Sequence, residues 1–217
     1  MNQENIIQQT MKFVQEKLEG EGSGHDWWHV YRVWKNSLKI CKEEKVDLFV
    51  VQLAALLHDI ADFKLHCGDE EIGPKTAKDF LTTLNVETEI IEHVCEIIRT
   101  VSFKGAKVNI PVKTLEGKVV QDADRLDAMG AMGISRCFAY GGSQGRSIYD
   151  PGIKPKMHKS FEEYKKSNTP SITHFYEKLL LLKDRMNTRT GKLIAKKRHD
   201  FMTSYLDRFF EEWEGKS

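Results

Sequence analysis

Apolar side chains recur at three- and four-residue intervals along almost the whole of this chain. Near the start, Ile6, Ile7, Met11 and Val14 share one helical face, and Gly20 ends the run. No stretch of the sequence keeps the alternation of apolar and polar residues that a half-buried β-strand requires. The pattern therefore predicts an all-α fold.

Capping residues and turn signals mark where further helices should begin. Asp26 and Asp47 stand where N-cap residues are expected, and Pro74 suits the first turn of a later helix. The segment 141–170 begins rich in glycine, proline and lysine and has no period, so a long loop is expected there. The remaining helices are expected over residues 88–100, 112–124, 124–140, 171–186 and 189–214.

Length, charge and cysteine content limit the classes of protein to which the chain can belong. With 217 residues and 40% hydrophobic content, the chain can bury the core of a single domain. Its 33 basic and 32 acidic residues nearly cancel, which argues against non-specific nucleic-acid binding. The N-terminus lacks a signal-peptide pattern and no apolar run is long enough for a membrane span, so a cytoplasmic protein without membrane contact is expected. The widely spaced cysteines are expected to be free thiols: Cys41, Cys67, Cys95 and Cys137.

A pair of polar residues at the end of an apolar helix, His58 and Asp59, gives the first indication of chemistry. Adjacent helical residues point about 100° apart, so both can reach one point, such as a metal ion, only near a helix end or kink. His29 lies one helix earlier, and Asp124 in VVQDADRLDA can supply a second carboxylate. Two imidazoles and two carboxylates suit manganese, iron, cobalt, magnesium or zinc, and they leave two octahedral positions open for chemistry.

Two other aspartates within one helical turn are alternative candidates for the last ligand. Asp122 and Asp127 flank Asp124 closely enough that helical spacing alone does not choose among the three.

Three motifs together resemble the HD-domain metal-dependent phosphohydrolases, most closely their compact single-domain bacterial members. The motifs are HDWWH around His29, LLHDIADFK around the His58–Asp59 pair, and DADRLDA. The later segments HFYEKLLLLKDRMNT and RHDFM also look like that subgroup, so the resemblance covers nearly the whole chain. It implies one helical HD domain over 1–217, with a metal-binding core at about 20–140 and C-terminal helices over 171–214.

The resemblance also implies the ligand set for one divalent metal ion. The ligands would be His29, His58, Asp59 and Asp124, with Asp122 and Asp127 left as supporting or helix-capping residues. Manganese is the expected metal, and iron, cobalt, nickel, magnesium and zinc are alternatives.

A second metal ion is less favoured. Relatives with two metals place extra histidines between the HD pair and the final aspartate. His66 lies too close to the pair for such a helical position, and His93 alone is not enough.

Asp62 is the candidate catalytic base. It follows His58 by four residues and Asp59 by three, so a continued helical turn would place it on their face. A carboxylate there can take a proton from the attacking water or orient that water for attack on phosphorus. Related hydrolases place an acidic residue here in that role, and the alternative is a solvent-exposed carboxylate that closes the helix.

Several cations could bind phosphate near this centre, because positive charge stabilises a phosphoryl group during its transfer. The alternative for any of these lysines is a solvated helix face. The candidate substrate contacts are His25, Lys64, His66 and Lys104.

For function, the resemblance implies metal-dependent hydrolysis of a nucleotide. The close subgroup includes enzymes that convert nucleoside triphosphates, especially deoxy forms, to monophosphate and pyrophosphate. The alternatives are a 5'-nucleotidase that releases inorganic phosphate and a nucleotide or metal sensor without turnover. A homodimer is compatible with the sequence.

The segment 141–160 favours a polyphosphate substrate through its cations: Arg146, Lys154, Lys156, His158 and Lys159.

The sequence AMGAMG, residues 128–133, places two glycines in a segment that is otherwise helical. Glycine in a helix interior costs about 1 kcal/mol relative to alanine. We therefore expect Gly130 and Gly133 to permit close helix packing behind the metal site.

Overall fold

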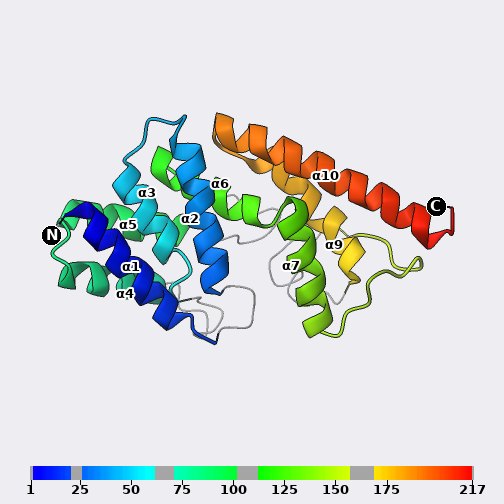
Figure 1. The fold of residues 1–217 in the computed structure, drawn as a ribbon, viewed down its shortest axis with the longest axis horizontal. Coiled ribbons are helices and arrows are strands. Elements are labelled where there is room, and N and C mark those ends of the chain that lie inside the picture. The colour runs from blue at the N-terminus through cyan, green and yellow to red at the C-terminus, as the bar shows by residue number, and fades with distance from the viewer. Residues whose placement is uncertain (1, 21–25, 62–70, 102–111, 157–168, 217) are drawn as a thin grey trace. The chain divides into compact units, whose positions relative to one another are not determined.

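A computed structural model gives the arrangement of most of the chain, and the all-α prediction is confirmed for the residues it describes (Figure 1). In that part of the chain the regular structure is helical and contains no strand. The described residues are 2–20, 26–61, 71–101, 112–156 and 169–216.

The described residues divide into two compact units. The first, called unit 1, contains the described residues up to Val101 and those from Val112 to Asp124. The second, called unit 2, contains the described residues from Arg125 onward. The boundary falls inside helix α6 (Leu115–Asp127), and the organisation of the whole chain as one domain stays a prediction.

Helix α3 (Leu48–Leu57) is the centre of unit 1. It packs against α1 (Gln3–Lys17), α2 (Trp27–Cys41) and α5 (Thr88–Val101), while α4 (Ile72–Thr83) packs on α5. A helix that is apolar on all sides must be buried on all sides. The fully buried side chains of α3 meet this requirement: Val51, Leu53, Ala54, Ala55, Leu56 and Leu57.

The helix starts in unit 1 follow from local capping. Asp26 and Asp47 are the N-caps of α2 and α3, as predicted, and their carboxylates accept hydrogen bonds from first-turn backbone N–H groups. Pro74 lies in the first turn of α4, which begins at Ile72. Helix α6 begins at Leu115 rather than Val112, because the Thr114 hydroxyl accepts the Gly117 N–H and so caps the helix there.

Unit 2 is built on the long helix α10 (Arg189–Trp213). It packs against α7 (Gly130–Ser143) and against the 3-10 helix η2 (Leu179–Arg185), and α9 (Ser171–Glu177) contacts both α7 and η2. Among the described residues of both units, no helix has the length and apolarity to cross a bilayer.

The prediction of one continuous helix over 171–186 is wrong. The helix breaks at Lys178, whose φ and ψ are −142° and −58°. Beyond the break the chain forms a 3-10 helix with three residues per turn. That period places Leu179 and Leu182 above one another, and both are buried. A run of four leucines at this point therefore follows a three-residue period that the sequence alone does not reveal.

The first part of the expected long loop, residues 144–156, lies against the rest of unit 2. The Ser147 and Ile148 carbonyls accept the backbone N–H groups of Ser171 and Ile172. The Tyr149 ring lies 5.0 Å from the ring of Trp213 at the end of α10. The described part of the loop is thus attached to both α9 and α10, whereas His158 and Lys159 lie outside the described residues.

The two glycines of AMGAMG are required for different structural reasons. Gly130 has a φ of +70°, and a Cβ there would lie 3.1 Å from the Arg198 side chain of α10. A Cβ on Gly133 would lie 2.3 Å from the Ala128 carbonyl oxygen. The expected contact with another helix therefore applies to Gly130, whereas Gly133 is confined by the chain just before its own helix.

Replacing Gly133 with alanine is expected to lower the free energy of unfolding by about 1–3 kcal/mol, because the methyl group overlaps the Ala128 backbone. The matched control is Gly142→Ala in the same helix, where a Cβ meets no atom within 4 Å. That control should leave stability unchanged or raise it by up to about 1 kcal/mol. Urea unfolding followed by circular dichroism compares the two, and equal midpoints would contradict the steric explanation.

Candidate metal centre

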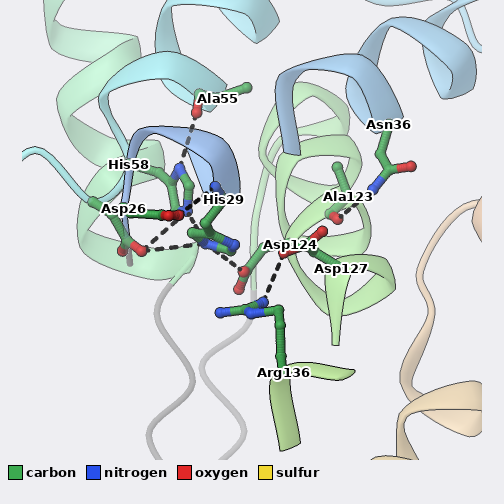
Figure 2. A network of polar contacts seen from close by, with 10 residues as sticks. Asp26, His29, Asn36, Ala55, His58, Ala123, Asp124, Asp127 and Arg136 are labelled. Carbon is green, nitrogen blue, oxygen red and sulfur yellow. Dashed lines mark hydrogen bonds and ion pairs between the residues drawn. The ribbon is translucent and has the colours of Figure 1, made fainter. Parts of the chain in front are cut away.

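The predicted ligands converge inside unit 1 from three segments of the chain. His29 comes from α2, His58 from the turn that follows α3, and Asp124 from α6 (Figure 2). Asp59 lies next to His58 in the same turn. The HD pair lies at a helix end, as its chemistry requires, because α3 finishes at Leu57. Two adjacent residues can therefore reach the same point.

The backbone of His29 is fixed by the cap of its own helix. The Asp26 carboxylate accepts a hydrogen bond of 2.9 Å from the His29 N–H. The His29 side chain is only 1% exposed, so its imidazole lies in the interior of unit 1. The N-cap that begins α2 thus also holds a candidate metal ligand in place.

A backbone carbonyl sets the orientation of the second imidazole. His58 Nδ1 lies 2.9 Å from the Ala55 carbonyl oxygen (Figure 2), which can only accept, so Nδ1 carries the proton of the neutral ring. This assignment leaves a lone pair on Nε2, which faces His29 Nε2 at 3.3 Å. A hydrogen bond from the other ring nitrogen to a backbone carbonyl is the usual support for a metal-binding histidine.

Four short distances join the donor atoms of this cluster. His29 Nε2 lies 3.3 Å from His58 Nε2 and 3.3 Å from Asp59 Oδ2. His58 Nε2 lies 3.4 Å from the same Asp59 oxygen, and Asp124 Oδ1 lies 3.5 Å from His29 Nε2. Among the described residues, His29, His58 and Asp59 form a compact group able to hold a metal ion, and Asp124 joins that group through His29.

These distances fit ligands around one cation. Donor atoms bound at about 2.1 Å lie about 3.0 Å apart in an octahedron and about 3.4 Å apart in a tetrahedron. Two nitrogen lone pairs and two carboxylates would repel one another if they converged without positive charge between them, and a divalent ion removes that repulsion. The donor set therefore fits a divalent metal.

The cluster is open on its carboxylate side. The imidazoles of His29 and His58 are 1% and 2% exposed, whereas the carboxylates of Asp59 and Asp124 are 15% and 27% exposed. A solute can therefore reach the carboxylates more readily than the imidazoles. This arrangement suits a centre whose remaining coordination positions face the substrate.

Asp122 and Asp127, the alternatives to Asp124 as the last ligand, lie in different surroundings. Asp122 is fully buried, and the 1% exposed carboxylate of Asp127 pairs with Arg136 at 2.7 Å. His93, considered for a second metal, lies 3.8 Å from Glu116 and is not a member of the compact group. Asp124 Oδ1, by comparison, lies 3.5 Å from His29 Nε2.

Two supporting contacts were missed from the sequence. Asn36 donates from Nδ2 to the Ala123 carbonyl oxygen at 3.4 Å, and Arg136 forms the pair with Asp127. Of these two contacts, only the one made by Asn36 could have been predicted from the sequence. Asn36 follows His29 by seven residues and therefore shares its face of α2.

The catalytic and substrate-binding predictions lie outside the described residues. This applies to Asp62, His25, Lys64, His66 and Lys104.

Comparison with known proteins identifies the family. The sequence model of the HD domain matches residues 27–129, which include His29, the His58–Asp59 pair and Asp124. The Bacillus subtilis protein YpgQ is 38% identical over 210 residues, which cover 96% of this chain and 94% of YpgQ. The chain belongs to the HD superfamily.

Solved structures agree with this assignment. An HD-superfamily hydrolase from Bacillus thuringiensis is 42% identical, with a TM-score of 0.78 over 98% of this chain and 99% of that one. The structure of B. subtilis YpgQ in complex with ADP is 35% identical, with a TM-score of 0.76 over 97% and 100% of the two chains. This HD protein is accordingly a metal-dependent hydrolase.

Alanine substitution of any one ligand should abolish stoichiometric metal binding, because the donors act as a unit on one ion. We expect the wild type to retain about one Mn²⁺ per chain after dialysis, a number that elemental analysis measures. The variants are His29→Ala, His58→Ala, Asp59→Ala and Asp124→Ala.

Two matched controls distinguish a ligand from a nearby residue of the same type. His93→Ala removes an imidazole that pairs with Glu116, and Asp122→Asn changes a buried neighbour of Asp124, so both should retain the ion. Full metal content in Asp124→Ala together with loss in Asp122→Asn would refute the choice of the last ligand.

Proposed function

We propose that this HD hydrolase converts a nucleoside triphosphate, preferably a deoxy form, to the monophosphate and pyrophosphate. The reaction would occur at one divalent ion, preferably Mn²⁺, held by His29, His58, Asp59 and Asp124. The observation that carries the proposal is the convergence of two buried imidazoles and two partly exposed carboxylates within 3.3–3.5 Å contacts.

The choice of a nucleotide as substrate is supported by the relative that binds one. YpgQ forms a complex with ADP, and its sequence aligns with this chain along nearly the full length of both. A diphosphate bound by a relative with this sequence similarity favours a nucleotide over other phosphate esters. The site of that ADP on this chain is part of the proposal.

The chemistry divides between the ion and the protein. When bound, the metal supplies positive charge that polarises a phosphoryl oxygen and favours ionisation of water. The buried imidazoles fix its position, and Asp62 takes the proton as the water oxygen bonds to the α-phosphorus. The bond between that phosphorus and the bridging oxygen breaks, and the electron pair leaves with pyrophosphate.

Cations supplied by the protein would hold the terminal phosphates. His25, Lys64, His66 and Lys104 are proposed to contact the substrate near the metal. The segment with Arg146, Lys154 and Lys156 adds further positive charge, and its backbone is attached to Glu177 through the Lys156 N–H at 3.1 Å. A monophosphate would not require so many cations, which is why the proposal favours a triphosphate.

The bond that breaks can be identified by phosphorus NMR of the reaction products. With dNTP and Mn²⁺, the expected first products are dNMP and pyrophosphate, and the Asp59→Ala variant gives the background. Orthophosphate as the first product, or turnover of dNMP but not of dNTP, would assign a 5'-nucleotidase. Saturable binding of nucleotide without any product would assign a sensor.

Replacing Asp62 with asparagine tests its role as the base. We expect Asp62→Asn to retain the metal but to lose about 100- to 10,000-fold in kcat, because it removes a proton acceptor without removing a ligand. The matched control is Asp79→Asn, which alters an exposed carboxylate on α4 and should leave kcat unchanged. Wild-type kcat for Asp62→Asn at saturating substrate and metal would exclude the catalytic role.

A further inference from the structure

The last turn of α6, directly after Asp124, is held by arginine side chains. Arg136 of α7 forms an ion pair with Asp127 at 2.7 Å, and the Asp127 side chain is 1% exposed. Arg198 of α10 donates to the Leu126 carbonyl oxygen. Arg125 of α6 itself donates to the Arg185 carbonyl oxygen at the end of η2. All these contacts lie within unit 2.

These arginines satisfy the electrostatic demands of a helix end. The last carbonyl groups of a helix lack intrahelical partners and carry partial negative charge, so cations stabilise them. Burial lowers the pKa of the Arg198 guanidinium from its ordinary value, and the negative charge of Asp127 acts in the opposite direction. The Asp127 carboxylate thus interacts with two guanidinium groups, one in direct contact.

The anchored turn is continuous with the turn that carries the metal ligand. Asp127 follows Asp124 by three residues in one helix, a rise of about 4.5 Å along the axis. Figure 2 shows Asp124 and Asp127 on α6, with the Arg136 side chain of α7 paired with Asp127. Holding Asp127 therefore stabilises the helical turn of α6 that also carries Asp124.

Asp124 needs such support more than the other ligands do. It has the highest exposed fraction of the four side chains, 27%, and its 3.5 Å contact with His29 is the longest of the cluster distances. A ligand that is not enclosed by packing must be positioned through its backbone. Asn36 contributes from α2 by binding the Ala123 carbonyl oxygen, one residue before Asp124.

We propose that the Asp127–Arg136 ion pair is a positioning device for the metal ligand Asp124, which acts by holding the last turn of α6 in its helical conformation, so that metal affinity depends on this pair. This inference rests on the proposed metal centre. A purely structural pair would affect unfolding alone, whereas a positioning pair also affects metal affinity and the geometry around the ion.

The test is a Mn²⁺ titration of the full-length, metal-free protein without nucleotide. Electron paramagnetic resonance of free aqueous Mn²⁺ gives the dissociation constant and needs no catalysis. Arg136→Gln and Asp127→Asn are each expected to weaken Mn²⁺ binding by about 10-fold or more, the size typical of residues that support ligands. The double variant should be no weaker than the single ones, because either change breaks the same pair.

Two further variants control for charge and for the loss of any ion pair. Arg136→Lys keeps the positive charge and should bind Mn²⁺ more tightly than Arg136→Gln. Arg99→Gln removes the exposed pair between Arg99 and Glu71, whose atoms lie 2.9 Å apart in unit 1, and should bind like the wild type. The spectrum of bound Mn²⁺ should change in Arg136→Gln but not in Arg99→Gln.

The outcomes separate this inference from the proposed function. Wild-type Mn²⁺ affinity in Arg136→Gln and Asp127→Asn, with only a lower unfolding midpoint, would overturn the positioning role and leave the metal centre intact. Absence of Mn²⁺ binding by the wild type would overturn both. If Asp127→Asn does not fold, Arg136→Gln decides alone, because Arg136 is 25% exposed and tolerates truncation better.

Discussion

Two imidazole nitrogens that face each other at 3.3 Å inside unit 1 impose the main constraint on the structure. As metal ligands both nitrogens would present lone pairs, an arrangement that is unfavourable unless each ring is oriented and a positive charge lies between them. The Ala55 carbonyl orients His58, and the Asp26 cap holds the backbone of His29. The packing of α2 against α3 brings the two imidazoles to this point.

Helix α3 shows how an apolar core can position polar chemistry. Its residues are buried except for Leu48 and Gln52, so its orientation is fixed by packing against α1, α2 and α5. Because the helix ends at Leu57, the His58–Asp59 pair emerges from a rigid element rather than from a mobile loop. Its burial thus supplies the precision that a ligand pair needs.

Local patterns in the sequence predicted much of this, and long-range contacts account for what they missed. The caps Asp26 and Asp47 were readable because a cap interacts within its own first turn. The helix break at Lys178 and the Asp127–Arg136 pair depend on contacts that no local pattern encodes. The choice of Asp124 as the last ligand came from a family motif, because periodicity did not distinguish it from Asp122 and Asp127.

The short motif DADRLD acquires a physical explanation from these contacts. Its second aspartate, Asp124, reaches the metal cluster of unit 1, and its third, Asp127, is anchored to Arg136 in unit 2. A spacing of three residues places both on nearby faces of one helix, close enough that the anchor controls the ligand. Asp127 would lose that control if the helix were interrupted between them, so the proposed positioning role requires α6 to remain helical from Asp124 to Asp127.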